Sequence, residues 1–248
     1  MSGLASEYLD AAIDLLRRIR DEEAEPLGEA AAAIADAVEA GGQVFAFGCT
    51  HSALPVQDVV YRAGGFMLVN PLLGPGITSL DVRPATLTSA MEKLEGYAEA
   101  LLDASPLVAG DVLIVVSVSG RNAVPIEMAQ LARERGATVI GVTSRAYTSA
   151  VTSRHPSGKK MADFAHIVLD NKVDKGDAVL AHERVPQRFC PASGVTSTAL
   201  LQALVAATIG ELVDRDMTPP VFLAANVDGG AEYNAQLFAE YGDRIHYL

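Results

Sequence analysis

The chain contains 248 residues, of which 50% are hydrophobic and 20% are charged, and this balance excludes a protein that is disordered throughout. Its 19 Lys and Arg against 31 Asp and Glu give a net charge of −12, which argues against a general binder of nucleic acid or of an anionic membrane. A small anionic ligand is compatible with this charge, because backbone N–H groups and hydroxyls can hold a phosphate inside a pocket.

The first forty residues predict two helices. Apolar residues recur at helical spacing from Leu4 to Ile19, and a second stripe runs from Leu27 to Val38, just after Pro26. The stripe from Leu4 to Ile19 has no assigned partner in the core. We therefore expect a homodimer with this helix in the interface.

After residue 40 the pattern changes to short apolar runs that alternate with helical stretches. The predicted strands are 44–47, 66–69, 112–116, 138–142, 165–169 and 221–224, and the predicted helices among them are 53–63, 88–103, 123–135 and 195–215. Nearly continuous β-branched runs are typical of strands buried on both faces of a parallel sheet. The alternation predicts a doubly wound, mostly parallel α/β sheet with flanking helices and right-handed crossovers.

Neither a repeat nor a low-complexity linker divides the chain, so we predict a single domain over residues 1–248. It consists of N-terminal helices (1–40), a core (41–215) and a C-terminal strand and helix (216–248). The least regular segment is 70–87, which lies beside a strand end. Long loops of this kind in a compact domain often serve function.

Two small, hydroxyl-rich loops each follow a strand and lead into a helix, with the sequences GCTHS (48–52) and SVSGRN (117–122). Helix N-terminal amides and hydroxyls at the carboxyl ends of parallel strands can bind an anion. The alternative is that Ser119 or Asn122 only caps the next helix. Two equivalent loops favour the anion site. Neither loop is a Walker A or GxGxxG sequence, which disfavours an ATPase or a nicotinamide dehydrogenase and leaves a sugar phosphate as the expected ligand.

The run DVLIVVSVSGRN (111–122), followed by GATVIGVTS (136–144), resembles the sugar isomerase (SIS) domain family. The loop at 48–52 is similar to the first loop of that family, and the resemblance extends over about residues 41–215. It implies a flavodoxin-like fold and a phosphosugar site that lies near the interface of the expected homodimer. The chain looks closest to uncharacterised bacterial SIS proteins of the phosphosugar, or phosphoheptose, isomerase type.

The resemblance also implies roles for individual residues. The phosphate would be held by Ser52, Ser117, Ser119 and Asn122, with Gly48 and Gly120 in the same loops, and Thr143 and Ser144 would line the sugar side. Ser193 and Thr196 open the final long helix and would face the ligand, although capping alone explains them equally well.

Aldose–ketose isomerisation needs a group that moves a proton between C1 and C2. The predicted helix 88–103 carries Glu92 and Glu95 on one face, and the resemblance favours a catalytic glutamate in this stretch, Glu95 ahead of Glu92. Most carboxylates of an acidic chain are merely solvated. His51 in the first loop and His182 before the final helix are further acid–base candidates.

Three functions fit these residues. The first is a phosphosugar isomerase, the second a non-catalytic phosphosugar sensor that acts through a protein partner, and the third an etherase-like lyase of an amino-sugar phosphate that uses Glu92 and Glu95. Five scattered histidines without CxxC or HxxxH spacing predict no metal site, and we expect no cofactor. The basic segment 154–160 reads as a solvated loop or as a lid over the phosphate.

Two cysteines cannot build a disulfide framework, and the acidic N-terminus does not resemble a signal peptide. Uncharged stretches fall short of the roughly 20 residues that span a bilayer. We therefore expect a cytoplasmic protein with no membrane and no nucleic acid as partner.

Overall fold

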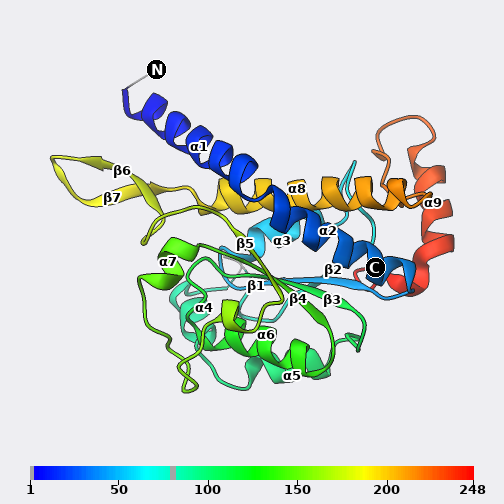
Figure 1. Cartoon of the computed structure of the whole chain (residues 1–248), viewed down its shortest axis with the longest axis horizontal. Coiled ribbons are helices and arrows are strands. Elements are labelled where there is room, and N and C mark those ends of the chain that lie inside the picture. The colour runs from blue at the N-terminus through cyan, green and yellow to red at the C-terminus, as the bar shows by residue number, and fades with distance from the viewer. Residues whose placement is uncertain (1–2, 79–81) are drawn as a thin grey trace.

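A five-stranded parallel sheet forms the centre of the computed structural model, which describes residues 3–78 and 82–248 (Figure 1). The strands are β1 (Val44–Gly48), β2 (Val69–Leu72), β3 (Val112–Val116), β4 (Thr138–Thr143) and β5 (Ile167–Asp170). Their order is β2-β1-β3-β4-β5, and every pair is parallel. This is the flavodoxin-like order of a doubly wound sheet, so the predicted fold class is confirmed.

Alternate side chains of β1 enter two separate cores, which explains why the strand reads as a continuous apolar run. Val44 and Ala46 pack in the core formed with α2 (Ala24–Glu39) and α8 (Ser193–Asp214). Phe45 and Phe47 pack on the opposite face, in the core formed with α5 (Tyr97–Asp103) and α6 (Ala123–Glu134). The sheet is therefore covered by helices on both faces, as parallel sheets require.

Helix α8 is, among the described residues, the one helix long and apolar enough to cross a membrane by length and composition alone. Here it lies along α2 and α3 (Ala53–Val59), and its residues Leu200, Leu201 and Leu204 are buried in the core. Its apolar composition thus serves packing within this fold.

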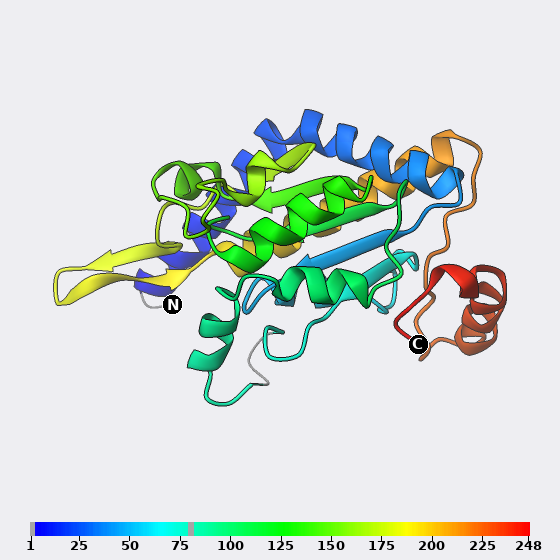
Figure 2. The same cartoon turned by 90° about the horizontal axis from the view of Figure 1, so that it is seen from below.

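One end of the molecule carries α1 (Gly3–Glu22) and an antiparallel hairpin, β6 (Ala178–His182) with β7 (Val185–Pro191). Both project from the sheet, whereas α9 (Gly230–Tyr241) packs at the opposite end (Figure 2). Helix α1 buries Ala12, Leu15 and Ile19 but leaves Leu9 and Ile13 exposed. The hairpin was not predicted, because most of its residues are exposed and no buried face produces a periodic pattern in the sequence.

Several predicted elements differ from the observed ones. The strand expected at 66–69 begins instead at Val69, and the strand expected at 221–224 is reduced to one isolated bridge between Phe66 and Val221. The helix expected over 88–103 is broken into α4 (Thr86–Met91) and α5. Gly96, the residue directly before α5, has φ of +80°, a left-handed conformation that interrupts a right-handed helix and suits glycine. Glu92 and Glu95 therefore do not share a helical face, and this prediction was wrong.

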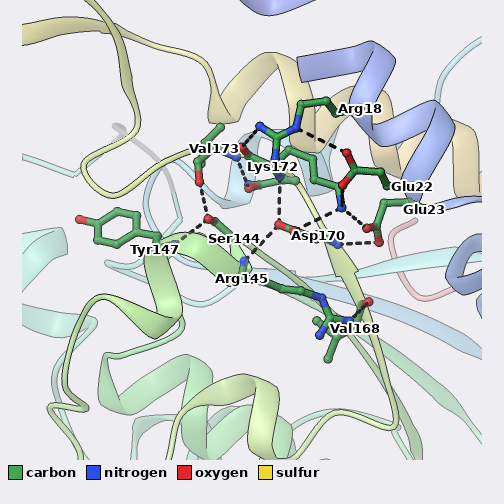
Figure 3. A network of polar contacts seen from close by, with 11 residues as sticks. Arg18, Glu22, Glu23, Ser144, Arg145, Tyr147, Val168, Asp170, Lys172 and Val173 are labelled. Carbon is green, nitrogen blue, oxygen red and sulfur yellow. Dashed lines mark hydrogen bonds and ion pairs between the residues drawn. The ribbon is translucent and has the colours of Figure 1, made fainter. Parts of the chain in front are cut away.

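A buried polar network fixes the end of β5 to the junction of α1 and α2 (Figure 3). The Lys172 Nζ lies 3.1 Å from a Glu22 oxygen and 3.4 Å from an Asp170 oxygen, and it donates to Glu23. The Asp170 amide donates to the second oxygen of Glu23 at 3.0 Å. Burial alone lowers the pKa of Lys172, but the hydrogen bonds to Glu23 and Glu22 and the charge of Asp170 outweigh it and raise that pKa.

The same network continues to the short helix α7 (Arg145–Ser149), which follows β4. Asp170 accepts a hydrogen bond from the Arg145 amide at 3.0 Å, while Ser144 accepts one from Tyr147 and donates to the carbonyl of Val173. The N-terminal helical extension, the sheet edge and the start of α7 are thereby held as one unit.

Candidate functional site

A cleft of about 630 Å³ opens at the carboxyl ends of β1 and β3. The strand order reverses its direction between these two strands, and ligands of open α/β sheets bind at such a switch point. Of the site residues expected from the sequence, those that line this cleft are His51, Ser52, Glu92, Ser117, Ser119, Asn122 and Ser193.

The first loop is tight because of Gly48. A Cβ atom at this position would stand 2.2 Å from the carbonyl oxygen of Ser52, so only glycine allows the chain to turn from β1 into α3. The amide of Thr50 donates to the carbonyl of Ile77 at 2.7 Å, which fastens the loop to its neighbour. Gly48 therefore allows the tight first loop to form, but it does not itself line the cleft.

The second loop is held from below by the end of β4. The Thr143 hydroxyl and the Ser144 amide both donate to the carbonyl of Val118, at 3.1 Å and 3.0 Å. Gly120 in turn accepts a hydrogen bond from the Met161 amide at 2.9 Å. Thr143, Ser144 and Gly120 thus support the loop that presents Ser117 and Ser119, and they lie outside the set that lines the cleft.

Ser52 and Asn122 occupy the N-cap positions of α3 and α6, yet within the described part of the chain neither side chain makes a capping hydrogen bond. The Asn122 Oδ1 instead accepts from Arg154 at 3.2 Å. Capping therefore does not account for these two residues, and their side chains are directed to the cleft and its walls.

Glu92 is the carboxylate that the helix break brings to this cleft. Burial raises its pKa above the ordinary value, although a hydrogen bond from Asn122 and the positive charges of Lys93 and Arg154 act in the opposite direction. Cys49 lies beneath the loop. Burial, together with the charge of Glu92, raises the pKa of its thiol well above normal, so it is a packed thiol and not an activated nucleophile.

The N-terminus of α8, the third helix start considered in the sequence, already has an anionic partner. An Asp177 carboxylate oxygen accepts the amides of Ala192 and Ser193, at 3.1 Å and 2.7 Å, and the carboxylate also accepts the Ser193 hydroxyl. Thr196 is buried, and its hydroxyl donates to the carbonyl of Ser193 at 3.4 Å. An anion is therefore favoured at the α3 and α6 loops and disfavoured at α8.

Two predicted acid–base residues lie elsewhere in this chain. His182 ends β6 in the projecting hairpin, is exposed, and accepts a hydrogen bond from the Arg184 amide at 3.2 Å. Glu95 lies in the turn between α4 and α5, next to Glu127 and His155, and does not line the cleft.

Several residues that line the cleft were not predicted as site residues, namely Tyr8, Thr50, Tyr147, Asp177 and Ser197. Tyr8 was counted in the apolar stripe of the first helix, but its hydroxyl donates to the carbonyl of Pro191 at 3.2 Å. The position of Thr50 inside the first loop was an available signal. Asp177 carried none, because its partners lie 15 and 16 residues further along the chain.

Comparison with known proteins shows the family and the fold of this chain. The SIS domain sequence profile matches residues 7–144. The UPF0309 protein of Streptomyces coelicolor is 54% identical over 243 residues, which cover 98% of this chain and 97% of that protein. The phosphoheptose isomerase of Neisseria gonorrhoeae has the same fold, with a TM-score of 0.55 at 21% identity, over 84% of this chain and 97% of that one. The NanR protein of Vibrio vulnificus, complexed with ManNAc-6P, matches with a TM-score of 0.52 at 14% identity, over 97% of this chain and 70% of that one.

Proposed function

Because this chain belongs to the SIS domain family, we propose that it binds a sugar phosphate in the cleft and interconverts its aldose and ketose forms. The observation that carries the proposal is the convergence of two hydroxyl-rich loops on one cleft. Within the described part of the chain, the side chains of Ser52 and Asn122 in these loops make no capping hydrogen bond. The ligand of NanR, ManNAc-6P, is a sugar phosphate.

In this proposal the phosphate lies between the starts of α3 and α6. Ser52, Ser117 and Ser119 donate hydroxyl hydrogen bonds to it, and the positive end of the α6 dipole favours its charge. The phosphate does not occupy the start of α8, because Asp177 already takes those amides and would repel a second anion. The sugar then extends toward Glu92 and Tyr147.

Glu92 is the proposed base. It removes the proton from C2 of the aldose to give an enediolate, and it returns that proton to C1, while the proton of the C2 hydroxyl passes to the C1 oxygen, to give the ketose. Its raised pKa suits this exchange, since a carboxylate that is more basic than usual accepts a carbon-bound proton more readily. His51, exposed in the first loop, is proposed to move the proton that opens the sugar ring.

The proposal includes a cytoplasmic homodimer. Leu9 and Ile13 form an exposed apolar face on α1, while Tyr8 of the same helix lines the cleft. A second chain that covers this face would lie beside the site. The two cysteines, buried Cys49 and exposed Cys190, are both free thiols, as is usual in a reducing compartment.

A panel of hexose, amino-sugar and heptose phosphates tests the function. At least one should raise the Tm of the protein and be converted, with the aldose and ketose forms measured by NMR. The variant Ser119→Trp should abolish the thermal shift, because the indole fills the phosphate position. Binding without conversion would leave a sensor and remove the enzymatic claim, whereas an undiminished shift in S119W would overturn the phosphate assignment.

A further inference from the structure

The fold gathers three metal-binding side chains that are far apart in the sequence: Glu95, Glu127 and His155. One carboxylate oxygen of each glutamate and one imidazole nitrogen of His155 all lie within 4.8 Å of one another. The sequence had predicted no metal site, because the five histidines are scattered and none has a neighbour at ligand spacing. We propose that this cluster binds a divalent cation of the zinc class, with water completing the coordination.

The distance between His155 and Glu127 supports a shared metal. His155 Nε2 and Glu127 Oε1 are 3.4 Å apart. This exceeds the roughly 2.7–3.2 Å of an N–H···O hydrogen bond. Two ligands at about 2.0–2.1 Å from a tetrahedral zinc ion are separated by about 3.3 Å, which is the observed spacing. The exposed Glu95 completes the set with a small movement of its side chain.

Both inner ligands are oriented by neighbouring groups. The amide of Gly96 donates to Glu127 Oε2 at 2.8 Å, which turns the other oxygen, Oε1, toward His155. The Ser157 amide donates to His155 Nδ1 at 3.3 Å, and the hydroxyl of Ser157 lies 2.7 Å from the same nitrogen. Zinc binding at Nε2 would require the tautomer that is protonated at Nδ1, in which Nδ1–H donates to this hydroxyl and the long bond from the amide is given up.

Charge and burial favour a cation here. The side chains of Glu127 and His155 are only 12% and 13% exposed, and the carboxylate of the exposed Glu95 lies within 4.8 Å of both. The nearest basic residue in sequence, Arg154, is turned away and donates to Asn122 at 3.2 Å. A divalent ion would offset the repulsion between Glu95 and Glu127, and it would do so more fully than one protonated imidazole.

The ion would join three segments: the turn between α4 and α5, helix α6, and the loop that follows α7. This loop is next to the cleft, since the Arg154 amide donates to the Arg121 carbonyl at 2.8 Å. Glu92 lies three residues before Glu95 in the same turn. A metal at this position would therefore stabilise the wall that carries Glu92 and Asn122, whatever ligand the cleft binds.

The test is a titration of the full chain, freed of metal by a chelator, with zinc chloride. We expect one zinc per chain at this site by calorimetry, and a rise in Tm of about 5–10 °C when free zinc is about 100 times its Kd. Magnesium, which prefers all-oxygen ligands, should produce little change at the same concentration.

The variants His155→Asn and Glu127→Gln should each lower zinc affinity by at least tenfold, and exposed Glu95→Gln should also weaken it. His182→Asn, which removes an exposed histidine of the hairpin, should bind as the unmodified protein does. Far-UV circular dichroism establishes whether each variant folds. If H155N or E127Q does not fold, the zinc affinity of E95Q tests the site, because the Glu95 side chain is exposed. The proposal would be overturned if zinc did not raise the Tm of the unmodified protein. It would also be overturned if H155N and E95Q bound zinc as tightly as the unmodified protein does.

Discussion

The amide nitrogen of Ser193 lies 2.7 Å from a carboxylate oxygen of Asp177, so the start of the longest helix is occupied by an anion that the chain itself supplies. The helix starts at α3 and α6 have no side-chain cap of this kind among the described residues. Because the three helix starts border one cleft, this difference is the reason that the proposed phosphate position lies at the two uncapped helix starts.

The variant Asp177→Ala removes the acceptor of the Ala192 and Ser193 amides. Loss of a helix cap usually costs about 1 kcal/mol of unfolding free energy, and we expect a decrease of this size in urea denaturation. Asp174→Ala, an exposed change in the same loop, is the matched control and should leave the midpoint unchanged. Equal midpoints for the two variants would contradict the capping role of Asp177.

The variant Glu92→Gln should lower kcat by about 10²–10⁴, because a positioned general base is removed. The unmodified enzyme should lose activity as the pH falls through the pKa of Glu92, since the base must be ionised. Because burial raises this pKa, that loss should occur above pH 4.5, the ordinary value for glutamate. A profile of kcat/KM between pH 4 and 9 measures it.

The Tm of E92Q shows whether a loss of activity comes from the missing base or from unfolding of the variant. A carboxylate whose pKa is raised by folding stabilises the protein below its unfolded pKa and loses that contribution as the pH rises. E92Q should therefore have a Tm at pH 7 equal to or above that of the unmodified protein. Glu99→Gln, an exposed change on α5, is the control for activity, and an E92Q enzyme as active as E99Q would exclude Glu92 as the base.

The variant Gly48→Ala should disrupt the first loop, because the new Cβ would meet the Ser52 carbonyl at 2.2 Å. We expect a loss of about 1–3 kcal/mol in unfolding free energy and at least a tenfold weaker thermal response to sugar phosphate. Gly210→Ala in α8 has open space around its Cβ and should stabilise the helix by about 0.5–1 kcal/mol. Similar results for the two alanines would show that the close approach at Gly48 is unimportant.

The variant Lys172→Met leaves the buried carboxylates of Glu23 and Asp170, which are 4% and 10% exposed, without their shared ammonium group. Breaking a buried ion pair in this way costs about 3–5 kcal/mol, and thermal denaturation should show a correspondingly lower Tm. Lys175→Met, an exposed change nearby, is expected to be neutral. A K172M protein as stable as K175M would mean that the network contributes nothing to the fold.

The variant Ile13→Glu tests the proposed assembly. Ile13 is 44% exposed on the outer face of α1, and a charge there should oppose burial in an interface. The unmodified chain should sediment as a dimer at micromolar concentration, and I13E as a monomer with an unchanged circular dichroism spectrum. A monomeric unmodified chain would remove the dimer from the proposal.

Strands β1, β3 and β4 were predictable because burial on both faces leaves a continuous apolar run in the sequence. The hairpin β6–β7 was not, because its residues from Ala181 to Arg188 are exposed and carry no periodic pattern. The helix expected over 88–103 followed from its apolar spacing, but the conformation of Gly96 overrode that local preference. The spacing of apolar residues in the sequence therefore predicts which segments are buried, but it does not predict where a helix is interrupted.

The candidate site divides in the same way. Ser52, Ser117 and Ser119 could be placed at the cleft because strand ends in a parallel sheet meet at one edge. The contacts of Asp177, and the cluster of His155 with Glu95 and Glu127, join segments that are separated in the sequence. Such contacts have no local signal, so only the folded structure shows them.

The break between α4 and α5 also separates two carboxylates, Glu92 and Glu95, that a continuous helix would have kept side by side. Glu92 turns into the cleft, where its neighbours are Asn122 and the loop hydroxyls. Glu95, three positions later, turns to an imidazole and a second glutamate on another element. One short stretch of irregular backbone thus gives two chemically identical side chains different neighbours. As a result, Glu92 belongs to the proposed sugar-phosphate site and Glu95 to the proposed metal site.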